Sequence, residues 1–441
     1  MDPAQKFGLH AVLLNVCGKS RKRDSNVILD SYSWGMAPFA YTRHHALAQI
    51  EEFQMHAADY GHRRNYVLSG GGNVTRLSPA VRARLVTERE LVHAWLARHP
   101  FAAVEKLIQE CCWRIYWKGW LELRPNVWAR WRQWQNTDPE MTVRIRALEE
   151  GRSGVAVMDA WASELVETGY LHNHARMWFA SFWVHVCRLP WQAGAAFFYR
   201  HLLDGDAASN TLSWRWVAGL QTRGKAYLVR RTNMEKYAGE HVTTFPEGLE
   251  RLNDDRVEAM EMDEDFALLE PGELPLLAGA WPSSEAWLVH GEDLSVEMVN
   301  CEAAPRVILL VPSRWNDAAG DYFSKPVLQF ESAALEDAER RLRAKFPEAT
   351  VELVSPDGET LACALRKNAV KQVAIVQPHV GWIGDAWPNW KQAISELGIE
   401  VMEWRRAADS AWFPHAKKGY FPFWQALRER LKREGAAAIP D

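Results

Sequence analysis

The segment 191–216 constrains this chain more than any other stretch. Two carboxylates flank a glycine in Asp204-Gly-Asp206, and an amide follows at Asn210. Two indoles then alternate with an arginine in Trp214-Arg-Trp216. Two acids around a glycine favour a turn or the entry to a helix over a helix face.

Two interpretations of this segment stay open on composition alone. In the first, the acids cap a helix whose two tryptophans are buried in the core. In the second, the segment binds a ligand, because aliphatic core positions do not need so many carboxylates, amides and indoles.

A second segment upstream identifies the pattern. It reads Gly-Tyr-Leu-His-Asn-His-Ala-Arg-Met over residues 169–177, and Trp191 follows it before the two acids. Together and in this order, these motifs resemble the flavin cradle of the DNA photolyase and cryptochrome family. The resemblance is strong over about residues 42–237 and loose over 305–430.

The resemblance implies that the cofactor is FAD. The glycine run before Thr75 predicts either a plain loop ahead of a Ser-Pro helix start or a loop that holds a diphosphate. Arg114, on a helix expected over 88–122, would pair with a flavin phosphate or form an ordinary surface ion pair. The family's cofactor contacts correspond to Tyr60, Thr75, Arg76, Leu77, Ser78, Arg114, Asn173, Arg176, Asp204, Asp206 and Asn210.

The resemblance also implies a substrate. Photolyases typically carry an amide at the position of Asn210, which favours DNA repair over sensing. Asn173 stands where enzymes for the six-four lesion carry histidine, which argues for cyclobutane pyrimidine dimers. The positions that hold the flipped lesion correspond to Glu110, Trp113, Asn173, Met177 and Trp216.

Tryptophan is unusually frequent, with 23 residues in the chain. Most indoles fill cores, but the family also uses three of them to carry electrons between the protein surface and the flavin. Here the resemblance assigns these roles to Trp214, Trp191 and Trp134, with Trp131 or Trp128 as substitutes for Trp134. Trp214, Trp191, Trp134, Asn210 and Glu110 are therefore the predicted catalytic residues.

The charge distribution divides the chain. Of the 52 basic and 56 acidic residues in the chain, residues 1–240 contain 31 basic and 22 acidic ones. Residues 241–441 contain the other 21 basic and 34 acidic residues. The acids concentrate between Glu247 and Glu297. We therefore expect an α-helical FAD-binding domain at 1–240, an acidic connector of marginal structure at 241–304 and a separate domain at 305–441.

The last 140 residues predict an α/β domain. Short apolar runs at 307–311, 351–354, 373–376 and 399–404 alternate with helical patterns, which indicates a doubly wound parallel sheet. The C-terminal part of this domain, from Leu397 to Trp424, resembles the end of the photolyase antenna domain. In photolyases the antenna domain normally precedes the flavin domain. The resemblance thus implies a circular permutation and leaves open a second, antenna chromophore.

The bulk properties limit the remaining choices. No apolar run is long enough to span a membrane, and the first residues lack a secretory signal pattern, so we expect a cytoplasmic protein. Six cysteines without a Cys-x-x-Cys pair predict no zinc site. The expected function is light-driven repair of pyrimidine dimers in DNA by a monomer, and the alternative is a cryptochrome-like photoreceptor.

Overall fold

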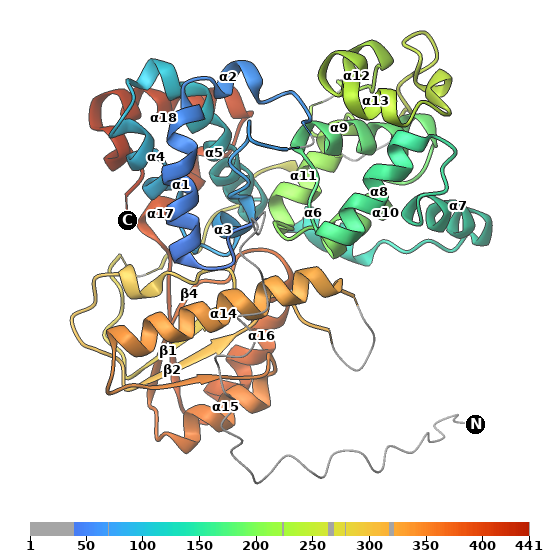
Figure 1. The fold of residues 1–441 in the computed structure, drawn as a ribbon. Helices are drawn as coiled ribbons and strands as arrows, with labels where there is room; N and C mark the ends of the chain where they lie inside the picture. Colours follow the sequence, from blue (N-terminus) through green and yellow to red (C-terminus); the bar gives the residue numbers. More distant parts are fainter. Residues whose placement is uncertain are drawn as a thin grey trace, which may run out of the picture. The chain divides into compact units, whose positions relative to one another are not determined.

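The computed structural model describes residues 39–68, 70–222, 225–262, 269–277, 279–316 and 322–440. Its first part is helical (Figure 1). The elements of this part are α1 Arg43–Ala57, α2 Tyr60–Arg63, α3 Ser78–Arg82, α4 Glu88–Leu96, α5 Phe101–Glu122, α6 Pro125–Gln133, α7 Pro139–Glu149, α8 Ala156–Thr168, α9 Asn173–Ser181, the π-helix η1 Phe182–Val186, α10 Trp191–His201, α11 Ala207–Val217, α12 Arg231–Tyr237, α13 Gly239–Thr244 and the 3₁₀ turn η2 Leu249–Leu252.

The second part contains the sheet. Its elements are β1 Ala286–His290, η4 Val296–Met298, β2 Val307–Val311, α14 Lys325–Lys345, β3 Thr350–Leu353, α15 Gly358–Lys367, β4 Gln372–Val376, α16 Trp382–Ser395, β5 Glu400–Trp404, α17 Ala407–Trp412, η5 Phe413–His415, α18 Tyr420–Glu434 and η6 Gly435–Ala438. Among the described helices, none is both long and apolar enough to cross a bilayer.

Local sequence signals explain where several helices begin. The single helical stretch expected over 88–122 is two helices. A helix cannot continue through Pro100, because the proline ring would clash with the carbonyl of Leu96, so α4 ends at Leu96 and Pro100 becomes the N-cap of α5. The first of these helices starts with a capping box, in which Thr87 and Glu90 each satisfy the other's backbone N–H. Trp134 lies just beyond the last residue of α6 rather than on its face.

The sheet is parallel, with strand order β3-β2-β1-β4-β5, which confirms the predicted doubly wound α/β fold. Side chains alternate between its two faces. Trp287 and Val289 of β1 share a core with α14, whereas Ala286 and Leu288 pack with α15 and α16. Both faces are therefore covered by helices, as a parallel sheet requires.

The central strand lies inside the predicted acidic connector. β1 is only Ala-Trp-Leu-Val-His, and acidic residues flank it on both sides, so the charge pattern conceals a fully buried strand. The sheet region thus begins near residue 286 rather than at 305. A continuous short apolar run is all that marks such a strand.

The end of the chain returns to the helical part. The Tyr116 hydroxyl donates to the Lys418 carbonyl, and Arg428 of α18 forms an ion pair with Glu105 of α5. The Tyr420 hydroxyl donates to the Gln109 carbonyl at 2.6 Å. Figure 1 shows α18 beside α4 and α5, away from the sheet. The stretch 305–441 is therefore not one packing unit.

Candidate functional site

The Asp204-Gly-Asp206 turn connects α10 to α11. The Asp206 carboxylate accepts from the Ser209 backbone N–H at 2.8 Å and caps α11. A side chain at Gly205 would lie 2.9 Å from the Leu202 carbonyl, so the tight turn needs glycine there. The capped helix with two tryptophans is thus present, and the ligand interpretation depends on what surrounds the two acids.

The first acid is held by an arginine fork. Arg176 donates from both terminal nitrogens to the two Asp204 oxygens, each at 3.0 Å, and from Nε to the Leu171 carbonyl at 2.8 Å. Its guanidinium also lies 5.1 Å from the centre of the Tyr170 ring. Three of the five N–H groups of Arg176 are used in these bonds, two of them on Asp204, so we infer that Arg176 orients Asp204.

The second acid lies between two cations. Asp206 is 2.9 Å from Lys118 Nζ and 3.9 Å from an Arg114 nitrogen, and all three side chains are largely buried. Burial alone would raise the pKa of Asp206, but Lys118 and then Arg114 offset this and hold it well below its ordinary value. Asp206 is therefore a fixed negative charge at physiological pH.

Three buried hydrogen-bond donors around the two acids lack an acceptor within the described part of the chain. They are Arg76 Nε, Arg114 Nε and His172 Nε2. Burial lowers the pKa of His172 to about 3, so its ring is neutral, and because Nδ1 accepts from the His174 N–H, the proton is on Nε2. Unpaired buried donors are costly and point to a missing acceptor.

The loop before α3 carries one of these donors. Arg76 has a left-handed backbone with φ of 52°, and its guanidinium lies against Gly71, where a Cβ would be only 1.9 Å from Nη2. Thr75 Oγ1 accepts from the Leu77 N–H at 3.4 Å, Leu77 is buried, and Ser78 begins α3. Tyr60, at the start of α2, packs edge-on against Phe53.

This donor set fits FAD. Guanidinium N–H groups that are buried and unpaired match a diphosphate, and the imidazole N–H matches a ribityl or ring oxygen. Arg114 also donates to Glu88 at 2.7 Å, so the ordinary ion pair that the sequence left open exists, yet it leaves Nε available. Arg76 and Arg114 would hold the phosphates, with Arg176, Asp204 and Asp206 as the fixed frame.

Asn210 and Trp214 lie on α11, where this helix crosses α10. Asn210 Nδ2 donates to the Ala195 carbonyl at 2.8 Å. Trp214 is buried, packs edge-on against Phe198, and passes directly over Gly194. The glycine therefore determines how closely the two helices approach.

Gly194→Ala is expected to displace Trp214 and to lower the free energy of unfolding by about 1–3 kcal/mol, because the added Cβ would lie 2.3 Å from the indole. Urea unfolding measures the change. Gly239→Ala is the matched control, since nothing lies within 4 Å of its Cβ position and its φ is not in the left-handed range. Equal stabilities of the two variants would contradict the close contact.

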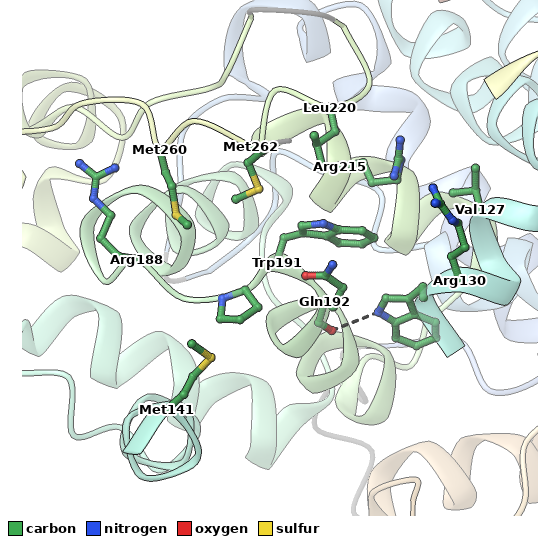
Figure 2. Close-up of a pocket in the computed structure, with 12 residues that line it drawn as sticks. Val127, Arg130, Met141, Arg188, Trp191, Gln192, Arg215, Leu220, Met260 and Met262 are labelled. Carbon is green, nitrogen blue, oxygen red and sulfur yellow. Dashed lines mark hydrogen bonds between the residues drawn. The ribbon is translucent and has the colours of Figure 1, made fainter. Parts of the chain in front are cut away.

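The outer tryptophans lie around a pocket. Trp191 is the first residue of α10, and the Trp131 indole N–H of α6 donates to the Gln192 carbonyl at 3.1 Å (Figure 2). Trp131 and Trp191 line this pocket together, and Trp134 is not among its lining residues. The geometry thus favours Trp131, one of the two substitutes, beside Trp191.

The predicted lesion residues are divided among separate local contacts. Glu110 forms ion pairs with Arg64 at 2.9 Å and Lys106 at 3.0 Å. Asn173 and Met177 face each other one turn apart on α9, with Nδ2 3.7 Å from Sδ. Trp216 stacks on Tyr227 at 5.4 Å.

The remaining lesion residue, Trp113, has a partner that the sequence does not predict. Tyr420 of α18 stacks on it with ring centres 3.4 Å apart and planes within 10°. A separation of 307 residues hides this contact from any local pattern. One indole face expected to receive the lesion is covered by the chain itself.

A group of buried charges joins α3 and α17 to the sheet, and the sequence does not predict it either. Arg84 donates to Asp293 at 2.9 Å and to both oxygens of Asp409, at 2.8 and 2.6 Å. Arg406 donates to the two Asp293 oxygens at 2.7 and 2.5 Å. Polar residues shortly after strand ends, such as Asp293 three residues after β1 and Arg406 two residues after β5, are the only signal of this group in the sequence.

A second arginine of the helical part, Arg82, also contacts this edge of the sheet. Arg82 of α3 donates to Ser313 at 2.8 Å and to Glu331 at 3.2 Å, and it lies 3.7 Å from Glu292. We call these residues, with Arg84, Asp293, Arg406 and Asp409, the edge cluster. It lies at the carboxyl end of the sheet, where doubly wound folds otherwise hold ligands.

The helical part is similar to known proteins. Residues 86–260 match the family model of the FAD binding domain of DNA photolyase. The chain is 29% identical over 208 residues to a deoxyribodipyrimidine photo-lyase of Escherichia coli, covering 44% of this chain and 43% of the relative. It is 34% identical over 157 residues to the enzyme of that name from Streptomyces griseus, covering 34% and 33%.

A solved structure is also similar. It is a bacterial class III photolyase from Agrobacterium tumefaciens, 26% identical, with a TM-score of 0.40 over 46% of this chain and 44% of that one. The matched part spans less than half the length of the curated relatives. The chain contains a helical FAD-binding domain of the photolyase type, followed by a domain with a five-stranded parallel sheet.

Proposed function

We propose that this protein repairs cyclobutane pyrimidine dimers in DNA with light, using FAD. The observation that carries the proposal is the set of buried, unpaired donors around Asp204 and Asp206. Two of them, on Arg114 and His172, lie within the region that matches the photolyase FAD-binding domain, and Arg76 lies shortly before it. Reduced FAD, when bound, would supply an electron to the dimer and recover it after the ring opens. The chain itself must bind the cofactor, admit the lesion and exclude water.

Each predicted residue has a physical role in this proposal. Asn210 would present its amide to the flavin, with its orientation fixed by the bond to Ala195. A dimer must leave the base stack to reach a buried flavin, and the indoles of Trp113 and Trp216 offer stacking surfaces in exchange. Glu110 would accept a hydrogen bond from the pyrimidine edge once it exchanges Arg64 or Lys106 for the lesion.

We further propose that the order of the domains reflects a circular permutation. The support is that a parallel sheet with central strand β1 follows the helical part, and that α18 returns to pack on α5. Such a rearrangement is physically tolerable when it joins segments that already lie together.

Repair is tested with reduced, FAD-loaded protein and an oligonucleotide that contains a thymine dimer. We expect blue light to restore thymine absorbance, and Glu110→Ala to lower the rate at least about tenfold, as for a lost charge-assisted hydrogen bond. Glu167→Ala, an exposed carboxylate on α8, is the control. No restoration by protein that carries FAD would contradict the proposal.

The second candidate is a cryptochrome-like photoreceptor. The specific observation in its favour is the Tyr420–Trp113 stack, which places a side chain of α18 on a surface that repair needs free. A receptor could transmit a light signal by releasing α18. In that case illumination would release α18 from Trp113 and would not repair dimers in DNA.

Tyr420→Ala separates the two candidates. If the protein repairs DNA, uncovering Trp113 is expected to strengthen binding to dimer-containing DNA by about three- to tenfold, because the lesion no longer displaces a stacked ring. Phe421→Ala, at the adjacent and 70% exposed position, is the control. Unchanged DNA binding, together with light-dependent hydrogen exchange in 420–434, would support the photoreceptor instead.

A further inference from the structure

Two buried indoles of α6 pack against each other close to Trp191. Trp128 and Trp131 lie one turn apart on this helix, with ring centres 4.8 Å apart and planes at 39°. Trp131 lines the same pocket as Trp191. Trp128 lies deeper, with 1% of its surface exposed, so solvent does not reach its indole. An oxidation that reaches Trp131 can therefore pass to Trp128 through ring contact.

The two indoles differ in the group that accepts their N–H. The Trp131 N–H donates to the Gln192 carbonyl at 3.1 Å, and a neutral amide oxygen is not a base near neutral pH. The Trp128 N–H donates to both carboxylate oxygens of Asp385, at 2.9 and 3.1 Å. A carboxylate can take a proton as well as accept a hydrogen bond. Of these two indoles, Trp128 is the one that faces a base.

Asp385 is placed to receive a proton and to release it. It lies in the first turn of α16, on the sheet part of the chain, and its side chain is 46% exposed. Arg132 Nε lies 3.4 Å from the carboxylate. Burial raises the pKa of Asp385, and Trp128 and Arg132 offset this only in part, so the carboxylate is a stronger base than an ordinary aspartate. One end of Asp385 thus contacts a buried indole and the other meets water.

We propose that Asp385 accepts the indole proton of Trp128 when Trp128 is oxidised. Oxidised FAD, when bound and excited by blue light, is the oxidant that takes one electron from the tryptophans of this chain. Trp128 replaces the electron lost by Trp131, its N–H bond breaks, and an O–H bond forms on Asp385. Trp128 is left as a neutral indolyl radical, and Asp385 passes the proton to water.

The proton transfer would hold the separated charges apart. Return of the electron to Trp128 as a radical cation needs one transfer, whereas return to the neutral radical also needs a proton. The base therefore prolongs the reduced state of the cofactor. The inference rests on the FAD binding of the proposed function, and it applies whether the protein repairs DNA or senses light.

The test is a blue-light flash on the full-length protein loaded with oxidised FAD, followed by visible absorption. The radical cation and the neutral radical of tryptophan absorb at different wavelengths, and we expect the neutral form. Asp385→Asn retains an oxygen that accepts the Trp128 N–H but is not a base. It is expected to leave the radical cation and to speed the return of the electron at least about tenfold. Asp385→Glu, which retains the carboxylate, should restore the neutral radical.

The matched control is Glu403→Gln. The Trp387 N–H donates to Glu403 at 2.6 Å, the same kind of bond within the sheet part, and neither residue lines the pocket at Trp191. This variant should leave the radical and its decay unchanged. A readout that needs no flavin is the indole N–H nuclear magnetic resonance signal of Trp128, which should move in Asp385→Asn and stay in Glu403→Gln.

Equal radical spectra and decay in Asp385→Asn and Glu403→Gln would overturn the inference. FAD content and dimer repair are measured on the same samples, so the two proposals fail separately. Repair by protein in which Asp385→Asn changes no radical would overturn the role of Asp385 alone. Protein that binds no FAD would overturn the proposed function and the inference with it.

Discussion

Arg84→Met is expected to lower the free energy of unfolding by about 3–5 kcal/mol, the cost of leaving buried charges without their partner. Arg84 is 3% exposed and bonds Asp293 and Asp409, which are equally buried. Burial alone would lower the pKa of Arg84, but Asp409 and Asp293 raise it above its ordinary value, so the side chain stays charged. Removing it leaves the buried Asp409 without its arginine partner, and Asp293 keeps only Arg406. Urea denaturation followed by circular dichroism measures the loss.

Arg98→Met is the control for this prediction. Arg98 also pairs with a carboxylate, that of Glu51, but both side chains are more than half exposed. Exposed pairs contribute about 0–1 kcal/mol. If Arg84→Met cost no more than Arg98→Met, the edge cluster would not hold the sheet to the helical part.

Arg176→Ala is expected to weaken FAD binding by roughly 30-fold or more, which corresponds to the 2–5 kcal/mol of a broken buried charge pair. The variant frees Asp204 from its two 3.0 Å bonds and leaves an uncompensated carboxylate where the cofactor must dock. Titration of the apoprotein with FAD, followed by quenching of the flavin fluorescence, gives the dissociation constant.

Two further variants show whether this loss is specific. Arg176→Lys retains the charge without the planar fork and should give an intermediate affinity. Arg152→Ala removes an exposed arginine that pairs with Glu150, two residues away, and should leave FAD binding unchanged. An unchanged affinity in Arg176→Ala would exclude Asp204 from the cofactor site.

Local patterns predicted most of the architecture. The alternation of apolar runs and helices after residue 305 indicated a parallel doubly wound sheet, and the strand at 307–311 is where the pattern placed it. β1 was missed because its five residues lie in a stretch dominated by acids. The charge of a long segment reflects all of its residues, and five buried residues change the acidic character of 241–304 very little.

The site was predictable only where its residues are close in sequence. Asp206 as a helix cap and the helix that carries Arg114 follow from local signals. Lys118, which holds Asp206, gives no such signal, since a lysine on a helix is usually solvated. The stack of Tyr420 on Trp113 and the edge cluster join positions hundreds of residues apart, and only the packed chain brings them together.

The electron-transfer chain remains a prediction. Trp128 and Trp131 lie on α6, whereas α6 ends at Gln133 and Trp134 lies outside it. Trp131 shares a pocket with Trp191. The local spacing could not show where the helix would end.

The most direct measurement is the amount of FAD that the purified full-length protein binds. Flavin released from protein that was reconstituted with excess FAD and desalted would be quantified against the protein concentration. We predict one FAD per chain, with the bound flavin reduced by blue light in the presence of a thiol. Folded protein that retains no FAD after reconstitution would contradict the assignment of the cradle around Asp204 and Asp206, and the proposed repair function with it.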